Sequence, residues 1–194
     1  VLGDLDRPGQ ASYPLDKILV RLARAYPDQT FGILVRGCDQ RGLNTLFVWN
    51  QVKREHVVPV GIACPEELAQ ACECQQPYPD EYVAGQAVEG RQFASVQHLE
   101  EQDVEDRFAY WMQEFQKCIK CFGCRDVCPV CFCKECSLEN SELIRTGTIP
   151  PANPAFHLTR AVHMAGRCID CGLCEQACPA DIPLRTLYKK VGQI

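Results

Sequence analysis

Cysteine is the residue type in this sequence that most clearly points to chemistry. The chain has 15 Cys among 194 residues, far more than ordinary packing requires. Two copies of the spacing C-x2-C-x2-C-x3-C, each followed by proline, begin at Cys118 and Cys168. Three thiolates at two-residue intervals can wrap one face of a cubane [4Fe–4S] cluster, while the fourth is held outside that loop. The spacing therefore predicts two [4Fe–4S] clusters.

The outlying cysteine of each copy determines how the two clusters are bound. Where two such motifs share a domain, the outlying cysteine ligates the cluster of the other motif. For the first cluster we predict the ligands Cys118, Cys121, Cys124 and Cys178. For the second cluster we predict Cys168, Cys171, Cys174 and Cys128.

Two zinc sites are the alternative for these motifs, because zinc also accepts four thiolates from C-x2-C pairs. A zinc ribbon needs only two such pairs. It does not require the third and fourth cysteines at this spacing, which occur in both motifs. The region 118–187 instead resembles the bacterial two-[4Fe–4S] ferredoxins, with a long insert, 129–167, between the two motifs. This resemblance implies a ferredoxin-like domain.

The cysteines outside the two motifs are sufficient for a third [4Fe–4S] cluster. They are Cys38, Cys64, Cys72, Cys74, Cys131, Cys133 and Cys136. One ligand set combines the three cysteines of the insert with an N-terminal one such as Cys74. The other set consists of Cys38, Cys64, Cys72 and Cys74, and spacing alone does not decide between them. Clustered free thiols oxidise readily, so we predict a third cluster that uses one of these sets.

The elements that would position these cysteines differ between the two halves of the chain. In the N-terminal half, hydrophobic periodicity predicts helices and strands in the order αβαβα, at 15–26, 30–35, 43–52, 56–62 and 66–71. We expect parallel strands, which would place Cys38 and Cys64 just past two strand ends, where open sheets bind ligands. A polar connector over 75–105 is expected next. Helices are predicted at 108–115 and 158–165.

The predicted fold class is therefore α+β, with two domains. A small parallel α/β unit occupies 1–105, and a two-[4Fe–4S] ferredoxin-like domain with the long insert occupies 106–194.

A second resemblance concerns the N-terminal half. The run RGCDQRGLNTL, then VGIAC, then CEC ahead of PYPDEY resembles the iron–sulfur region of coenzyme F420 hydrogenase and dehydrogenase β-subunits, over roughly 30–85. The resemblance implies a cluster bound by cysteines at the strand ends and in the close pair that follows. The close pair here is C-x-C, and the chain is too short for that family's full flavin-binding region. Flavin and F420 chemistry are therefore not implied.

Composition and missing motifs exclude several function classes. The formal net charge of −5 disfavours a general nucleic-acid binder, and no apolar run approaches the ~20 residues of a membrane span. No cationic-then-apolar signal peptide opens the sequence, so a cytoplasmic location is expected. The sequence also lacks the glycine-rich nucleotide loops and the hydrolase triads. These absences favour an electron carrier over an enzyme.

We therefore predict a non-catalytic subunit that relays low-potential electrons through about three [4Fe–4S] clusters. Its partners would be the catalytic subunit of an anaerobic oxidoreductase and a ferredoxin or other redox donor. The pattern resembles iron–sulfur subunits that accompany tungsten or molybdenum enzymes, one candidate being class II benzoyl-CoA reductase. The alternative is a redox enzyme with its own cysteine-built iron–sulfur centre, similar to heterodisulfide reductases or F420 dehydrogenases.

Overall fold

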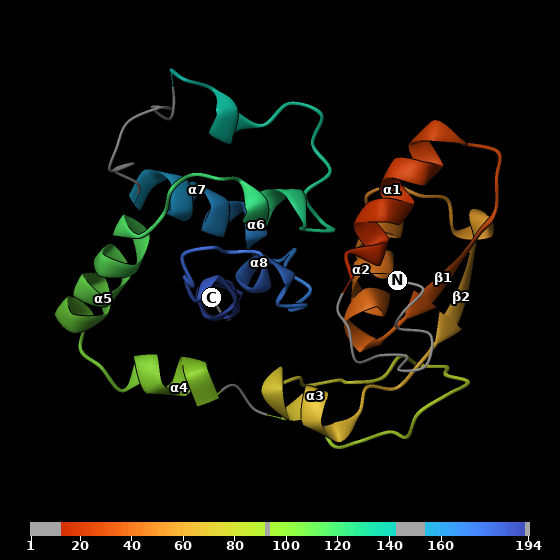
Figure 1. Ribbon diagram of the computed structural model, residues 1–194, viewed down its shortest axis with the longest axis horizontal. Coiled ribbons are helices and arrows are strands. Elements are labelled where there is room, and N and C mark those ends of the chain that lie inside the picture. Colours follow the sequence, from red (N-terminus) through yellow and green to blue (C-terminus); the bar gives the residue numbers. More distant parts are fainter. Residues whose placement is uncertain (1–12, 92–93, 143–153, 193–194) are drawn as a thin grey trace. The chain divides into compact units, whose positions relative to one another are not determined.

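The computed structural model describes residues 13–91, 94–142 and 154–192. Residues 143–153 of the predicted insert lie outside the described residues. The helices and strands in chain order are α1 Leu15–Ala25, β1 Phe31–Val35, α2 Gly37–Val48, β2 Val57–Gly61, α3 Glu66–Ala71, α4 Ala94–Glu100, α5 Val104–Gln116, α6 Gly123–Asp126, α7 Pro154–Met164, α8 Leu173–Gln176 and α9 Leu184–Val191 (Figure 1). The chain is thus mixed α and β, as the sequence predicted.

Contacts divide the chain into two compact units. The first unit consists of 1–93, 128–132 and 169–173, and the second consists of 94–127, 133–168 and 174–194. The predicted boundary after residue 105 falls inside α5, whose N-terminus is capped by Asp103 through a 2.8 Å bond from the Asp106 amide. The division at 105 stays a prediction.

A small parallel sheet forms the centre of the first unit. β1 pairs with β2 in register from Phe31 opposite Val57 to Val35 opposite Gly61, and α1 and α2 pack against β1. Its buried hydrophobic core contains Leu19, Val20, Ile33, Val35, Leu43, Leu46, Val52 and Val57. Pro59 lies exposed within β2, a position that a strand tolerates when the missing N–H faces away from the partner strand. The predicted parallel pair is confirmed.

The helix that follows β1 differs from its prediction. The sequence placed it over 43–52, but α2 begins at Gly37 and ends at Val48. Its start is fixed by Arg36 and Asp39: the Asp39 carboxylate accepts bonds from the Arg36 amide at 3.0 Å and from its Nε at 2.9 Å. Glycine lowers helix propensity, so the pattern around Gly37 concealed this first turn. As a result, Cys38 lies within the helix rather than in a loop before it.

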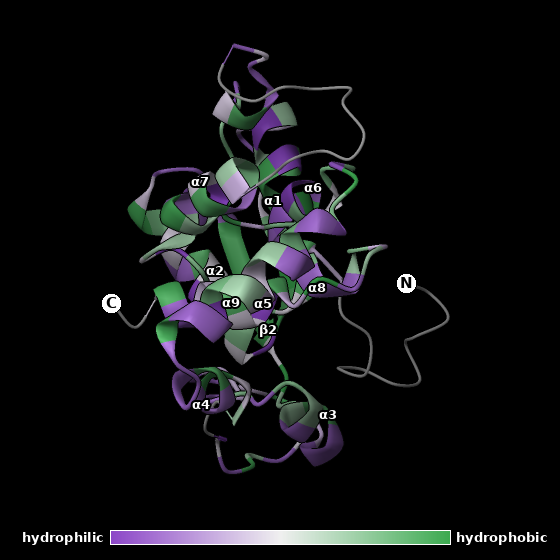
Figure 2. Cartoon of the chain, turned by 90° about the vertical axis from the view of Figure 1, so that its left-hand side faces the viewer, coloured by the Kyte–Doolittle hydropathy of each residue, from purple (hydrophilic) through white to green (hydrophobic). Residues whose placement is uncertain are grey.

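Helices α4, α5, α7 and α9 build the second unit, with α7 packed on α5 and α9 and with α4 packed on α9. Apolar and polar residues alternate along the helices in Figure 2, because each helix buries one face. The predicted aromatic helix 108–115 lies within α5, where Phe115 is buried and Phe108 is 66% exposed. The polar connector expected over 75–105 contains α4, which forms because Val96 and Leu99 bury one face.

Among the helices in the described part of the chain, none combines the length and the apolar character that a bilayer crossing requires.

Candidate metal centre

The two cysteine motifs repeat in backbone conformation as well as in sequence. In both copies the second and fourth residues after the first cysteine have positive φ. These are Lys120 and Phe122 in the first copy, and Asp170 and Gly172 in the second. Each loop then enters a short helix at the equivalent position, α6 and α8. Left-handed conformations are unfavourable for residues other than glycine and gather at functional sites. The repeated left-handed conformation therefore points to a functional constraint on both loops.

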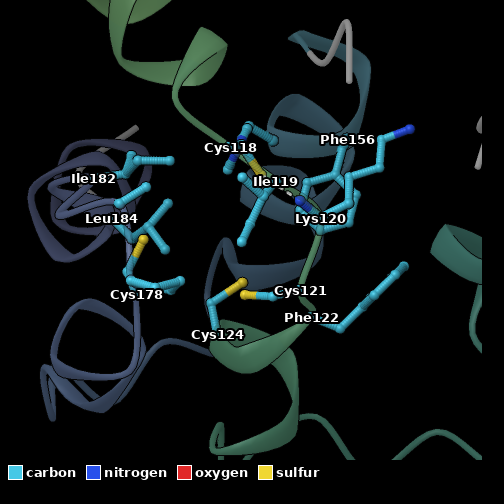
Figure 3. A pocket seen from close by; sticks show the side chains of 13 residues that line it. Cys118, Ile119, Lys120, Cys121, Phe122, Cys124, Phe156, Cys178, Ile182 and Leu184 are labelled. Atoms are coloured by element: carbon cyan, nitrogen blue, oxygen red, sulfur yellow. Dashed lines mark hydrogen bonds between the residues drawn. The ribbon is translucent and has the colours of Figure 1, made fainter. Parts of the chain in front are cut away.

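In the second unit, four cysteines line one hollow with about 340 Å³ of empty space, part of it open to solvent. They are Cys118, Cys121, Cys124 and Cys178, which are the ligands predicted for the first cluster. Figure 3 shows that Cys118, Cys121 and Cys124 come from the segment that enters α6, whereas Cys178 comes from the segment that continues to Ile182 and Leu184. The fold thus brings three cysteines of one motif together with the outlying cysteine of the other.

Apolar side chains form much of the remaining wall. They include Ile119, Phe122, Phe156, Ile182 and Leu184. Such a lining lowers the local dielectric and limits water access, which are two of the means by which a protein sets cluster potential. Cys118 and Cys124 are buried, Cys178 is half-buried and Cys121 is exposed. Four thiols at a hollow with a largely apolar lining are a donor set that fits a [4Fe–4S] cluster.

Burial raises the pKa of the Cys118 and Cys124 thiols. Two groups oppose this effect: the Lys120 amide donates to Cys118 Sγ at 3.4 Å, and the positive charge of Arg160 favours the Cys124 thiolate. Without metal these thiols hold their protons at neutral pH, so binding of iron must release protons. The two opposing groups would then stabilise the thiolates.

Arg160 places a buried positive charge beside this hollow. The side chain is 1% exposed, its Nη2 donates to the Cys124 carbonyl at 2.7 Å, and its guanidinium lies 5.7 Å from the centre of the Tyr188 ring. Its neighbour on α7, His157, is also 1% exposed and lines the hollow itself. Burial, aided by the charge of Arg160, lowers the pKa of His157 to about 4, so the imidazole is neutral at neutral pH.

The sequence did not single out either residue. The signal was available, because Phe156, His157, Arg160, Ala161 and Met164 fall on one stripe at helical spacing. A histidine and an arginine on an apolar stripe are candidates for function. His163, near the end of the same helix, is exposed.

The ligands predicted for the second cluster do not fall in a single unit. Cys128 and Cys171 belong to the first unit, and Cys168 and Cys174 belong to the second. Cys128 and Cys174 are buried and the other two are half-buried. This ligand set stays a prediction from the motif spacing.

A second group of cysteines surrounds the strand ends of the first unit. Arg36, at the end of β1, is 6% exposed and forms a buried ion pair with Asp39. Burial of the thiols raises the pKa of Cys38 well above its usual range and that of Cys64 to about 11. The charge of Arg36 opposes both shifts. A buried cation thus lies within electrostatic reach of cysteines that follow both strands.

Cys64 has two further cysteines as electrostatic neighbours, Cys72 and Cys74. Cys72 is the C-cap residue of α3. The Cys74 amide donates to the Ala69 carbonyl, and the Cys74 carbonyl accepts from the Arg91 amide. Cys64 also borders an open hollow with about 800 Å³ of empty space at the end of β2. Cys38, Cys64, Cys72 and Cys74 therefore all belong to one unit and surround the same end of the sheet.

The other ligand set suggested for a third cluster is divided. Cys131 belongs to the first unit, together with Cys74, whereas Cys133 and Cys136 belong to the second. Cys133 is exposed, and the Cys136 side chain interacts with Arg125.

Within the described ranges, no group of three or more His, Cys, Asp or Glu side chains is arranged to hold a single metal ion. In a cubane each iron takes one protein thiolate, so the four sulfurs are spread over four irons. The absence of a single-ion site among these residues therefore does not argue against a cluster in the hollow of the second unit.

Comparison with known proteins agrees with the motif analysis. Residues 117–183 match the family described as a 4Fe-4S dicluster domain. This is nearly the region, 118–187, in which the sequence resembles the two-cluster ferredoxins. The chain therefore contains a ferredoxin-like domain for two [4Fe–4S] clusters, and that prediction is confirmed. The match favours iron–sulfur clusters over the zinc alternative.

Two curated relatives match about half of the chain. The chain is 46% identical over 94 residues to the F420-dependent formate dehydrogenase subunit beta of Methanocaldococcus jannaschii, a match that covers 48% of this chain and 24% of the relative. It is 49% identical over 83 residues to the F420-dependent formate dehydrogenase 1 subunit beta of Methanococcus maripaludis, covering 43% of this chain and 21% of the relative. The matched region thus spans about a quarter or less of these relatives. Homology to the iron–sulfur region of such β-subunits, expected from the sequence, is confirmed.

Proposed function

We propose that this chain relays electrons through [4Fe–4S] clusters to or from the catalytic subunit of a multi-subunit oxidoreductase. The observation that carries the proposal is the hollow in the second unit, where three cysteines of the first motif meet the outlying cysteine of the second. This exchange of a ligand is the arrangement of two-cluster electron carriers. The relatives support the proposal, since both are named as β-subunits of dehydrogenases.

The chain's own residues would hold the clusters and balance their negative charge. When bound, a [4Fe–4S] cluster supplies one-electron redox chemistry. Cys118, Cys121, Cys124 and Cys178 would hold the first cluster in the apolar hollow. Arg160 would compensate negative charge at the Cys124 side, and the Lys120 amide would do so at Cys118 Sγ. The second cluster is assigned to Cys168, Cys171, Cys174 and Cys128 on motif spacing alone.

For a third [4Fe–4S] cluster we propose the ligands Cys38, Cys64, Cys72 and Cys74. Their membership of one unit supports this set over the one that includes Cys131, Cys133 and Cys136. The buried Arg36 would offset the negative charge of the thiolates. Within the first unit, Cys38 is also an electrostatic neighbour of Cys171.

The partner we propose is the catalytic subunit of a formate dehydrogenase, with coenzyme F420 as the second redox partner of the complex. The names of the two relatives support this choice. No comparison supports a tungsten-dependent benzoyl-CoA reductase as the partner. The alternative of an enzyme with its own catalytic centre depends on the seven cysteines outside the two motifs, which our third-cluster assignment explains in part.

Formate-driven reduction of the chain tests the proposal. The anoxically prepared protein is mixed with formate in the presence or absence of the catalytic subunit of a methanogen formate dehydrogenase. The cluster absorbance at about 400 nm is then followed. A relay predicts bleaching only when the catalytic subunit is present, and no turnover of formate or of a disulfide by the chain alone. Turnover by the isolated chain would support the enzyme alternative. A failure of the catalytic subunit to bleach the clusters would exclude formate dehydrogenase as the partner.

A further inference from the structure

His157 is a buried polar side chain that the described protein atoms leave unsatisfied. It lies on α7 and is 1% exposed, and neither Nδ1 nor Nε2 has a hydrogen-bond partner among the described residues. Its ring stacks on Phe115 with 4.6 Å between ring centres and an interplanar angle of 11°, and meets the edge of Phe156 at 5.1 Å. These two contacts fix the position of the imidazole.

A neutral imidazole carries one N–H in either tautomer. Buried donors in folded proteins nearly always have a hydrogen-bond partner. A buried donor without one has lost its hydrogen bond to water and gained none in return, which costs free energy. The aromatic neighbours of His157 offer no strong acceptor. The partner must therefore come from the remaining side of the ring.

His157 is itself a wall residue of the hollow lined by Cys118, Cys121, Cys124 and Cys178, and this hollow is therefore the candidate source of the partner. Thiolate and inorganic sulfide are the acceptors that this hollow would contain once iron is bound. Hydrogen bonds to cluster sulfurs are one of the principal means by which proteins set cluster potential.

We propose that the His157 ring N–H donates a hydrogen bond to a sulfur of the first [4Fe–4S] cluster and raises its reduction potential. The inference rests on the proposed ligand set for that cluster. The reduced cluster carries one more negative charge than the oxidised cluster, so a donor stabilises the reduced form more. His157 is a tuning residue and not a ligand, because the four cysteines already supply one thiolate for each iron.

The wild-type protein provides a direct test. Histidine occurs at four positions in the chain, so growth with 15N-histidine labels few sites. In the dithionite-reduced full-length protein, the paramagnetic cluster should show a magnetic coupling to a histidine 15N in pulsed EPR. If cluster signals are present and no such coupling is found, the inference is overturned.

Three variants locate the coupling and measure its effect. His157→Phe keeps an aromatic ring between Phe115 and Phe156 but has no N–H, His157→Gln keeps a donor, and His163→Gln changes the exposed histidine on the same helix. We expect His157→Phe to abolish the 15N coupling and to lower one midpoint potential in an EPR-monitored redox titration. His157→Gln should recover part of that shift, and His163→Gln should retain both the coupling and the potential.

Persistence of the coupling in His157→Phe, or an unchanged set of midpoint potentials in that variant at full iron content, would overturn the inference. Failure of the proposed function gives a different result. A protein without cluster signals contradicts the relay itself, whereas a protein with normal signals and no histidine coupling contradicts only the hydrogen bond.

Discussion

Replacement of Arg160 tests the electrostatics of the first centre. The guanidinium is buried and donates to the Cys124 carbonyl at 2.7 Å, so a positive charge lies beside a proposed ligand. Arg160→Met removes the charge and keeps most of the side-chain volume. Arg160→Lys keeps the charge but loses the planar fork of donors, and is the matched control.

The expected magnitude follows from Coulomb's law. The guanidinium acts on the Cys124 thiolate and donates to the carbonyl of the same residue. Two unit charges about 8 Å apart, a separation typical of such an arrangement, interact by about 2 kcal/mol at an effective dielectric constant of about 20. Since 100 mV corresponds to about 2.3 kcal/mol for one charge, the midpoint potential of the first cluster should fall by about 90 mV in Arg160→Met. Arg160→Lys should show a smaller change.

The assay is a redox titration of the anoxically purified variants, followed by EPR of the reduced clusters, with iron content measured in parallel. One midpoint should shift downward in Arg160→Met while the others stay in place. A shift of less than about 20 mV at full iron content, or an equal shift in Arg160→Lys, would show that the charge of Arg160 does not act on the cluster.

Three further predictions concern the remaining features. Cys178→Ala should remove the first cluster, with a loss of about four irons per chain, whereas Cys133→Ala, at an exposed cysteine, should retain all iron; equal losses would contradict the ligand assignment. Gly37→Ala would place a Cβ 2.0 Å from a backbone carbonyl oxygen of the loop that packs on α2, whereas Gly32→Ala meets nothing within 4 Å. Gly37→Ala should therefore lower the iron bound at the third site, as measured by iron analysis, and Gly32→Ala should not. Retention of all iron in both variants would argue against a third site beside α2. Asp39→Ala leaves Arg36 buried without its carboxylate, which should cost about 3–5 kcal/mol and lower the thermal unfolding midpoint by about 10 °C; an unchanged midpoint would show that the pair is dispensable.

Local sequence patterns predict much of this fold. The two cysteine motifs specify their clusters because ligand spacing along the chain matches the geometry of a cubane. Helix α1 follows from its strongly amphipathic sequence, and β1 and β2 follow from short β-rich runs between turns. In each of these cases the sequence pattern that allows the prediction lies within a few residues along the chain.

Features that depend on particular side-chain pairs or on distant contacts were not predicted. The start of α2 depends on the side-chain pair Arg36 and Asp39, which propensity does not register. The position of His157 in the hollow depends on how α7 packs on α5, and the hydrogen bond from Arg160 reaches a carbonyl 36 residues earlier. The choice among the seven remaining cysteines likewise required the assignment of each to a unit of the fold.

The iron and acid-labile sulfide content of the anoxically purified chain tests the central claim most directly. Three [4Fe–4S] clusters predict about twelve irons and about twelve sulfides per chain, and Cys64→Ala should lower both numbers to about eight. Zinc in place of iron, or iron without acid-labile sulfide, would contradict the account.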